Sequence, residues 1–194
     1  PTVLMVTFGM NDSGYYEYNG DNAKEFGEQK YQESIKNFQQ MEKRFKELPH
    51  TRIVMTGTSP YDETAQIKDN TVFKKKNETI KRIIEYQRES AARNGWEFTD
   101  WNAPMVAINQ ELQQKDPSFT LCGNDRIHPD NDGHMVMAYL FLKAQGFAGK
   151  DVANMEINAN KKQAVKAEGC TISNIKKIGK DISFDYLAEA LPYP

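Results

Sequence analysis

The sequence predicts an α/β fold in which a parallel sheet lies between two layers of helices. Residues 3–8 and residues 52–57 form continuous apolar runs rich in β-branched side chains. Such a run is typical of a strand that is buried on both faces, as the strands of parallel sheets are. Segments with helical periodicity follow each run, and this alternation of strand and helix is typical of a three-layer sandwich.

The composition is that of one domain, or of one domain with an appendage. The 194 residues are 39% hydrophobic and 27% charged, so the chain can bury a core but is rather polar. A net charge of -2 gives no electrostatic basis for binding nucleic acid or an anionic membrane. The sequence contains no apolar run long enough to span a bilayer.

Each predicted strand leads into a polar loop at its carboxyl end. The run 3–8 is followed by the turn Gly9-Met10-Asn11-Asp12-Ser13-Gly14, and the run 52–57 by a loop that contains Ser59. Residues 96–101 alternate in polarity and predict a third, more exposed strand. In open α/β sheets, ligands bind beyond the carboxyl ends of the strands. We therefore expect the functional site at this edge of the sheet.

Four segments have the apolar spacing of helices, with one apolar side chain every three or four residues. They are residues 31–48, 73–93, 104–114 and 132–145. Pro49 ends the first of them and Gly95 the second. The last is apolar on nearly every face, so we expect it to be buried or to lie across the sheet.

We predict a domain over residues 1–149 and an appendage over residues 150–194, because the composition changes between them. Residues 151–169 are polar and rich in Lys and Asn, which predicts a linker or a surface segment. Residues 170–175 and 182–186 alternate in polarity around a Lys-Ile-Gly-Lys-Asp turn, and this pattern predicts a small β-hairpin.

Two cysteines and three histidines limit the disulfide and metal chemistry of the chain. Cys122 and Cys170 can form one disulfide or remain two free thiols, and the sequence leaves both states open. With three histidines and no Cys-x-x-Cys, we do not expect a zinc cluster.

An acid–imidazole pair lies in the loop ahead of the last predicted helix. Asp125 precedes His128 by three residues in Asp-Arg-Ile-His-Pro. An Asp so placed can accept a hydrogen bond from the Nδ1–H of His128, which fixes the tautomer and leaves Nε2 free to take a proton from a nucleophile. Near the start of the chain, Asn11 lies at a strand end, where a site would form.

Together these two blocks resemble those of the SGNH hydrolases, also called GDSL-type esterases and acylhydrolases. In that family a Gly-x-Asn-Asp block follows the third strand, and an Asp-x-x-His block precedes the last helix. Gly9-Met10-Asn11-Asp12 and Asp125-Arg126-Ile127-His128 match these blocks in the same order. The resemblance covers residues 1–147 and implies a flavodoxin-like parallel sheet.

The resemblance implies ester hydrolysis by a Ser-His-Asp triad. In this scheme His128 is the general base and then the general acid, Asp125 orients it, and the Asn11 amide donates to the oxyanion. The implied substrate is an O-acyl group on a carbohydrate or a small carboxylic ester. Neither a metal nor an organic cofactor is implied, and neither nucleic acid nor a membrane is an expected partner. A secreted or periplasmic location is expected from the family alone.

The family's nucleophilic serine has no counterpart in this sequence. In the family it lies in a Gly-Asp-Ser-type block after the first strand, and a Gly in a second block gives another oxyanion donor. Both blocks are absent, because the chain begins at what corresponds to the third strand. We therefore expect the N-terminal strands and the serine on a missing N-terminal segment of the same protein. Without those strands, residues 3–8 are expected to form an exposed apolar edge.

Other residues at strand ends are weaker candidates for the nucleophile. Ser13 and Ser59 carry hydroxyls, but Ser13 shares a turn with Asn11 and is too close for the two to face a substrate from opposite sides. Cys122 lies near His128 in the sequence, so a Cys–His dyad with the thiol as nucleophile is a further interpretation. The strand-end Asn11 fits the serine-esterase scheme better.

Several aromatic and charged side chains have both a structural and a functional interpretation. Tyr15, Tyr16 and Tyr18 follow the Asn11 turn and either stack on a sugar ring or pack within the loop. Trp101 lies at a strand end and either lines the cleft or packs in the core. The charged run Lys74-Lys75-Lys76 is expected to be solvated surface.

Two functions follow from these observations. The first is a serine esterase whose base, acid and one oxyanion donor lie in this chain and whose serine lies outside it. The second is a catalytically silent carbohydrate-binding or interaction module on the same scaffold, which the absence of the serine block supports.

Overall fold

The computed structural model describes residues 1–68 and 71–190. The chain divides into two compact units, Pro1–Ala144 and the residues from Gln145 onward. The first unit contains the candidate site, and the second contains the predicted appendage, whose last four residues, 191–194, lie outside the described part. Among the described residues, no helix is both long enough and apolar enough to cross a membrane.

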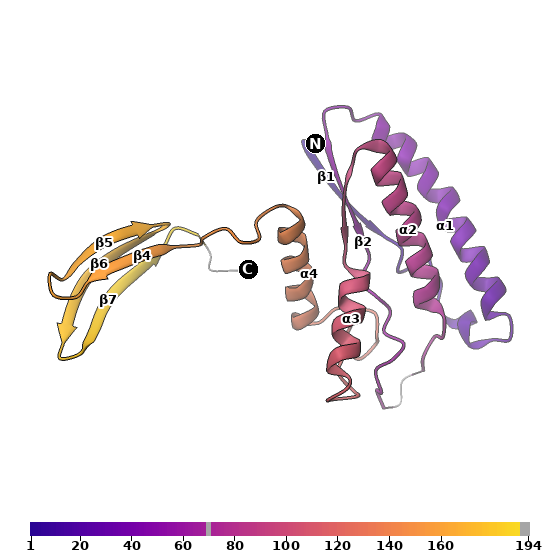
Figure 1. The fold of residues 1–194 in the computed structure, drawn as a ribbon. Coiled ribbons are helices and arrows are strands. Elements are labelled where there is room, and N and C mark those ends of the chain that lie inside the picture. The colour runs from indigo at the N-terminus through magenta and orange to yellow at the C-terminus, as the bar shows by residue number, and fades with distance from the viewer. Residues whose placement is uncertain (69–70, 191–194) are drawn as a thin grey trace. The chain divides into compact units, whose positions relative to one another are not determined.

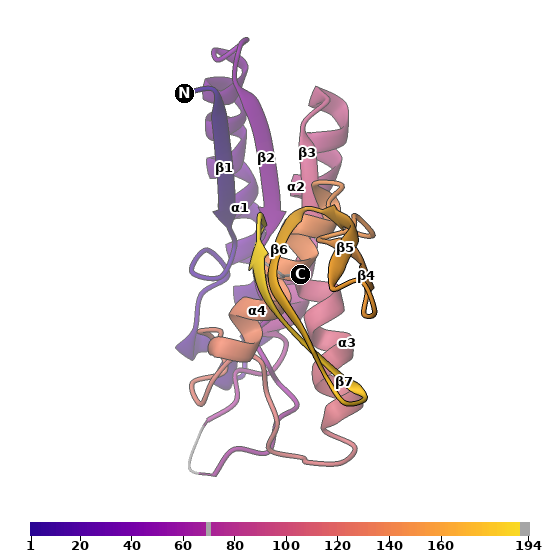
Figure 2. The ribbon, with the colours of Figure 1, turned by 90° about the vertical axis from the view of Figure 1, so that its left-hand side faces the viewer.

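A three-stranded parallel sheet forms the centre of the first unit, as the sequence predicts. Its strands are β1 (Val3–Phe8), β2 (Arg52–Gly57) and β3 (Glu97–Asp100), and they lie in that order across the sheet (Figures 1 and 2). Both neighbouring pairs are parallel, with Met5 opposite Val54 on β2 and Val54 opposite Glu97 on β3. The carboxyl ends of all three strands therefore reach one edge of the sheet.

Helices α1 (Ala23–Lys46) and α2 (Lys76–Asn94) lie side by side behind the sheet in Figure 2 and cover one of its faces. The predicted start of α1 at residue 31 is wrong, because Gly27 interrupts the apolar pattern. In the structure Gly27 is needed within the helix, since a Cβ there would lie 2.8 Å from Thr79 Oγ1 on α2. The predicted start of α2 at residue 73 is three residues too early.

Apolar side chains of β2 fix the sheet against these two helices. Ile53 and Met55 are 3% and 1% exposed and belong to one buried cluster with Phe38 of α1 and Ala91 of α2. Burial of each large apolar side chain stabilises the fold by about 1.5–3 kcal/mol. The central strand and the helix layer are therefore held together by packing, as the apolar run 52–57 predicts.

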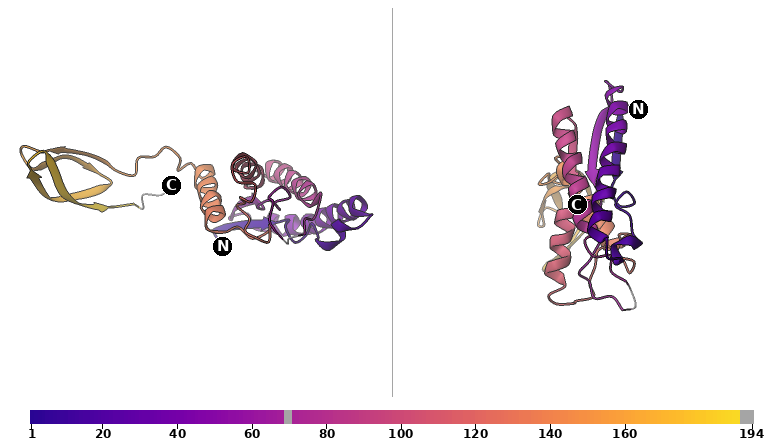
Figure 3. Two further views of the ribbon diagram at one scale, coloured as in Figure 1. Left: turned by 90° about the horizontal axis from the view of Figure 1, so that it is seen from below. Right: turned by 90° about the vertical axis from the view of Figure 1, so that its right-hand side faces the viewer.

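Helices α3 (Asn102–Leu112) and α4 (Asn131–Ala144) complete the first unit, and α4 lies on the side of the sheet away from α1 (Figures 1 and 3). The sequence predicts that this helix is buried or lies across the sheet, and burial is wrong for one of its faces. Val136 and Leu140 pack against the cluster around Met105, but Met135 and Tyr139 are 45% and 44% exposed. The helix is apolar all round, and the described chain covers one face of it.

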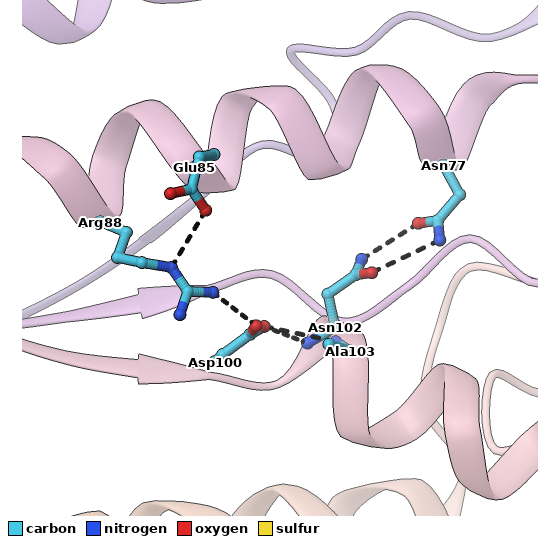
Figure 4. Close-up of polar contacts among 6 residues, drawn as sticks. All are labelled: Asn77, Glu85, Arg88, Asp100, Asn102 and Ala103. Carbon is cyan, nitrogen blue, oxygen red and sulfur yellow. Dashed lines mark hydrogen bonds and ion pairs between the residues drawn. The ribbon is translucent and has the colours of Figure 1, made fainter.

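Polar contacts fix α2 against the end of β3 and the start of α3 (Figure 4). The side-chain amides of Asn77 and Asn102 exchange two hydrogen bonds, of 3.4 and 3.0 Å. Oδ1 of Asp100 accepts from the backbone N–H groups of Asn102 and Ala103, which otherwise lack a partner at a helix start. Arg88 of α2 binds Oδ2 of Asp100 at 2.7 Å. The carboxyl end of β3 is thus tied to the helix layer.

The second unit consists of two antiparallel strand pairs. β4 (Asn154–Asn158) pairs with β5 (Gln163–Glu168), and β6 (Cys170–Ile178) pairs with β7 (Asp181–Ala188). The predicted hairpin is confirmed in β6 and β7.

The sequence predicts a linker or a surface segment over residues 151–169, and the first alternative is wrong, because β4 and β5 lie within it. The Asn- and Lys-rich residues between these strands form the turn, in which Asn158 Oδ1 accepts from the backbone N–H groups of Asn160 and Lys161. None of the residues of β4 and β5 is buried. Met155 and Ile157 alternate with polar residues along β4, a short strand signal that the Lys- and Asn-rich composition of the stretch masks.

Candidate active site

The turn after β1 (residues 9–14, the Asn11 turn) is closed by its own hydrogen bonds. The N–H of Gly9 donates to Asp12 Oδ2 at 3.0 Å, and the N–H of Ser13 donates to the Gly9 carbonyl at 3.1 Å. Gly9 has a φ of +136°, and a Cβ there would lie 3.2 Å from Thr58 Cγ2. Glycine alone adopts this backbone readily, so the residue type sets the turn. The Asn11 side chain is exposed within it.

Two features surround the Asn11 amide. The Tyr15 hydroxyl donates to Asn11 Oδ1 at 2.5 Å. A cavity of about 330 Å³ lies beside the turn, at the carboxyl end of β1. Its lining comes from the end of β1, the turn and one residue after β2, namely Thr7, Phe8, Gly9, Met10, Asn11, Asp12 and Thr58. The predicted edge of the sheet therefore carries a hollow next to the candidate oxyanion donor.

The loop ahead of α4 (residues 123–130, the His128 loop) brings Asp125 and His128 together. His128 Nδ1 lies 2.5 Å from Asp125 Oδ2, and Asp125 Oδ1 accepts from the N–H groups of Ile127 and His128 at 2.9 Å each. Burial opposes ionisation of Asp125, but these hydrogen bonds outweigh it and lower its pKa. Because a carboxylate only accepts, the neutral imidazole carries its proton on Nδ1 and leaves Nε2 free.

Arg126, between these two residues, anchors the His128 loop to the loop after β2. Its side chain is 1% exposed, and its Nη1 donates to the Asp62 carbonyl at 3.1 Å. Its own carbonyl accepts from the Asp62 N–H at 3.0 Å. Arg126 has a φ of +66°, a left-handed backbone that costs a non-glycine residue about 1–2 kcal/mol. The buried arginine therefore holds a strained backbone in place between the exposed Asp125 and the exposed His128.

The Asn11 turn and the His128 loop meet over one apolar cluster. Met10 of the turn, Tyr15 just after it and Ile127 of the His128 loop pack against the same buried residues. Burial raises the pKa of Tyr15, and so does the charge of Asp125, which puts that carboxylate within electrostatic reach of the Tyr15 hydroxyl. The structure thus gathers the three candidate catalytic residues at one edge of the sheet.

The alternative nucleophiles are buried. Ser13 is 0% exposed and Ser59 is 7% exposed. Cys122 is 0% exposed, its thiol donates to the Pro60 carbonyl at 3.2 Å, and burial raises its pKa to about 12. Such a thiol does not form the thiolate that a nucleophilic cysteine needs. Cys122 and Cys170 are both free and buried, each within its own unit.

The aromatic side chains have different roles. Tyr18 is 3% exposed and its hydroxyl donates to the Ser13 carbonyl at 2.7 Å, so it packs within the loop. Trp101 is 7% exposed and belongs to a buried cluster, so the interpretation that it lines the cleft is wrong. Tyr16 is 79% exposed. Of the three tyrosines, Tyr15 binds a candidate catalytic side chain.

Sequence reasoning missed two buried cations that hold the site, Arg126 and Lys76. The expectation that Lys76 is solvated is wrong, because its side chain is 0% exposed. One signal could have found it. Lys76 lies four and seven residues before Ile80 and Ile83, and therefore on the apolar stripe by which α2 faces the core. Arg126 has no such signal, since it lies in a loop.

A family model matches residues 1–136, which is nearly the whole first unit. That model describes GDSL-like lipases and acylhydrolases. The chain belongs to the GDSL-like lipase/acylhydrolase family. The family that the sequence predicts is thereby confirmed. Among curated proteins, none matches this sequence.

Solved structures share the fold of this family member. A mutant of Axe2, an acetyl-xylooligosaccharide esterase from Geobacillus stearothermophilus, gives a TM-score of 0.54 at 18% identity over 78% of this chain and 62% of Axe2. A catalytic mutant of Axe2, described as an acetylxylan esterase, gives 0.53 at 18% identity over 76% and 60%. Axe2 itself gives 0.50 at 20% identity over 76% and 60%. The chain thus spans about 60% of the length of Axe2.

Proposed function

We propose that this GDSL-family chain takes part in the hydrolysis of carboxylic esters, and that its substrate is an O-acyl group on a carbohydrate. One observation carries the proposal. An Asp125–His128 hydrogen bond, with Nε2 of the imidazole free, lies at the sheet edge that also carries the Asn11 amide. General base, orienting acid and amide donor are the groups that acyl transfer to a serine requires beside the serine itself.

His128 is the general base of the proposed reaction. Its Nε2 takes the proton of the attacking serine hydroxyl and later gives it to the leaving alcohol. Asp125 holds the imidazole by Nδ1 and stabilises the imidazolium that forms. Since hydrogen bonds lower the pKa of Asp125, this carboxylate is ionised at neutral pH, as that role requires.

Asn11 is the proposed donor to the oxyanion. Attack on the ester carbonyl leaves negative charge on its oxygen, and an amide N–H already aimed at that position stabilises it without reorganisation. Because the Tyr15 hydroxyl binds Oδ1 of Asn11, the Nδ2 end is the one available to substrate. A donor of this kind contributes roughly 3–4 kcal/mol to the transition state.

The nucleophile in this proposal is a serine on a further segment of the same protein. Ser13 and Ser59 are too buried to reach a substrate. The catalytic mutants of Axe2 replace a serine, an aspartate and a histidine, and the aspartate precedes the histidine by three positions. Asp125 and His128 have the same spacing. Axe2 therefore supports both the triad and an acetylated sugar as the substrate class.

Exposed apolar surface supports a further segment that packs on the first unit. β1 is an edge strand, with Val3 50% and Met5 46% exposed, and an unpaired edge can accept one more parallel strand. Met135 and Tyr139 of α4 are exposed as well. A segment over this region would also remove water from the site, which strengthens oxyanion stabilisation.

Active-site labelling tests this proposal. The intact protein, with any segment that precedes residue 1, is treated with a fluorophosphonate probe and assayed on p-nitrophenyl acetate and acetylated xylooligosaccharides. We expect one labelled serine outside residues 1–194, and loss of labelling and of turnover in His128→Ala. His50→Ala, at an exposed loop position, is the matched control and should keep both. An intact protein that neither labels nor turns over would refute the proposal.

A catalytically silent carbohydrate-binding or interaction module is the second candidate function. The burial of Ser13 and Ser59 favours it, because neither of these two strand-end hydroxyls can act as the nucleophile. Titration calorimetry of the intact protein with acetylated and deacetylated xylooligosaccharides distinguishes the two functions. A silent module binds an oligosaccharide that it leaves unchanged, whereas an esterase converts the first ligand into the second and releases acetate.

A further inference from the structure

The Asn11 amide needs a fixed direction to act as a donor. Its two ends have nearly the same shape, and an exposed Asn side chain turns freely unless something holds one end. Here the Tyr15 hydroxyl donates to Oδ1. Among the described residues, Nδ2 of Asn11 has no partner, so the donor end is the free one.

Tyr15 is itself held in place by a buried cation. The Nζ of Lys76 lies 3.8 Å from the centroid of the Tyr15 ring, a short cation–π distance. The ring of Phe73 contacts the same tyrosine edge-on, with 6.1 Å between centroids. The tyrosine ring therefore contacts both Lys76, the first residue of α2, and Phe73, which lies just before that helix.

Lys76 also holds the backbone of the Asn11 turn. Its Nζ donates to the Met10 carbonyl at 2.9 Å, to Ser13 Oγ at 2.6 Å and to the Gly14 carbonyl. Met10 and Gly14 are the neighbours of Asn11 and Tyr15 in the chain. An ammonium has three N–H groups, and the three acceptors use all of them. One side chain thus fixes the turn on both sides of the Tyr15–Asn11 hydrogen bond.

We propose that Lys76 and Tyr15 are positioning residues for the Asn11 amide. Lys76 holds the turn and the tyrosine ring, and the Tyr15 hydroxyl sets which end of the amide faces the substrate. The consequence for catalysis rests on the proposed function of Asn11, but the positioning itself does not.

A Ser13–Lys76 dyad is the competing interpretation of the same contacts, because a lysine can activate a serine. Geometry excludes it for this chain. Ser13 is 0% exposed, and its own hydroxyl proton goes to the Met10 carbonyl at 2.8 Å. A substrate cannot reach that hydroxyl, so the lysine acts on the turn and not on a nucleophile.

The environment of Lys76 makes its hold on the turn sensitive to pH. Burial lowers its pKa to about 7, and the charge of Asp12 opposes this shift. The other ionisable groups around it are Tyr15 and Tyr61, whose rings face Nζ, and Glu63, which binds the N–H groups on either side of the Lys76 backbone. A neutral amine has two N–H groups, so one of the three contacts is lost above neutral pH.

Side-chain NMR of the 194-residue chain tests the proposal without any catalytic assay. The Asn11 Nδ2 resonances are identified by their loss in Asn11→Ala, and their order parameter reports whether the amide is held. We expect a high order parameter in the wild type at pH 6 and a clearly lower one in Tyr15→Phe and in Lys76→Met. In the wild type the order should also fall as the pH rises through 7.

Matched controls come from the same segments. Tyr16→Phe removes the hydroxyl of an exposed neighbour in the chain, and Lys74→Met removes an exposed lysine just before α2, so both should keep the rigid amide. If Lys76→Met does not fold, Tyr15→Phe and the wild-type pH series decide. An Asn11 amide that stays rigid in folded Tyr15→Phe, or that is already mobile in the wild type, overturns the proposal.

Activity of the intact protein separates this proposal from the proposed function. If Tyr15→Phe loosens the amide and lowers kcat with KM unchanged, both proposals are supported. The loss should be smaller than the factor of about 10²–10³ that removal of a whole oxyanion donor brings. A loosened amide with unchanged kcat would still support the proposal that Tyr15 positions the amide, but it would refute the oxyanion role of Asn11.

Discussion

Nδ1 of His128 lies 2.5 Å from Oδ2 of Asp125, although 80% of the His128 side chain is exposed. The imidazole is therefore oriented by its own loop and not by enclosure. Two N–H groups of that loop bind the second oxygen of Asp125, and the buried Arg126 anchors the loop to the Asp62 carbonyl. In the described part of the chain, orientation of the imidazole therefore does not depend on closure of the site.

Asp125→Asn should separate orientation from folding. The amide retains an oxygen for the two loop N–H groups, but its NH₂ end faces Nδ1 and favours the wrong imidazole tautomer. We expect kcat of the intact protein on p-nitrophenyl acetate to fall by about 10⁴-fold, the loss known for such a change in a catalytic triad. The free energy of unfolding should change by less than about 1 kcal/mol. Asp132→Asn, at an exposed position on α4, is the control, and an equal loss of kcat there would contradict this prediction.

The pH dependence of stability should carry the signature of Lys76. Its pKa is about 7 in the folded chain and returns to 10.5 on unfolding, so between these values the unfolded state binds the extra proton. The free energy of unfolding should therefore rise with pH from about 7 to 10, by up to about 1.4 kcal/mol per pH unit. Urea denaturation at pH 6, 8 and 9 measures this slope. Lys76→Met should remove it and Lys74→Met should keep it; equal slopes in the two variants would refute the assignment.

The sheet could be predicted from the sequence because its signal is local. Residues 3–8 and 52–57 are apolar without interruption, and the chain folds them as β1 and β2 with those bounds. The polar turn after β1 likewise marks the edge where the site lies. The hydrogen bond between Asp125 and His128 is also local, because the two residues are only three positions apart in the sequence.

What could not be predicted depends on distant contacts. The apolar stripe of α2 could have indicated that Lys76 is buried, but its partners could not be predicted, because the carbonyls that accept its protons lie more than 60 residues away. Arg126 is buried through Asp62, 64 residues earlier. In the same way, Gly27 interrupts the helical pattern of α1 for a reason that lies on α2, where Thr79 approaches it.

Gly9→Ala should be far more harmful than a glycine substitution in open space. At Gly9 both the φ of +136° and the 3.2 Å approach to Thr58 oppose a side chain. At Gly95 the φ is +67°, a region that alanine can enter at some cost, and no atom lies within 4 Å of the new Cβ. We expect a loss of stability of about 1 kcal/mol for Gly95→Ala and at least about 2 kcal/mol for Gly9→Ala. Urea denaturation measures both, and a similar loss at the two positions would show that the turn tolerates another backbone.

Arg126→Met should loosen the His128 loop from the Asp62 segment that anchors it. The substitution keeps most of the buried volume but removes the hydrogen bond from Nη1 to the Asp62 carbonyl, and it leaves the left-handed backbone without that support. An unpaired buried carbonyl costs about 1–3 kcal/mol, and the loss of stability in urea denaturation should lie in that range. Arg44→Met, whose side chain is 80% exposed, should change stability by less than about 0.5 kcal/mol. Faster hydrogen exchange at the His128 N–H in Arg126→Met would show that the strained loop itself has loosened; unchanged exchange there, despite lost stability, would mean that Asp125 alone orients the imidazole.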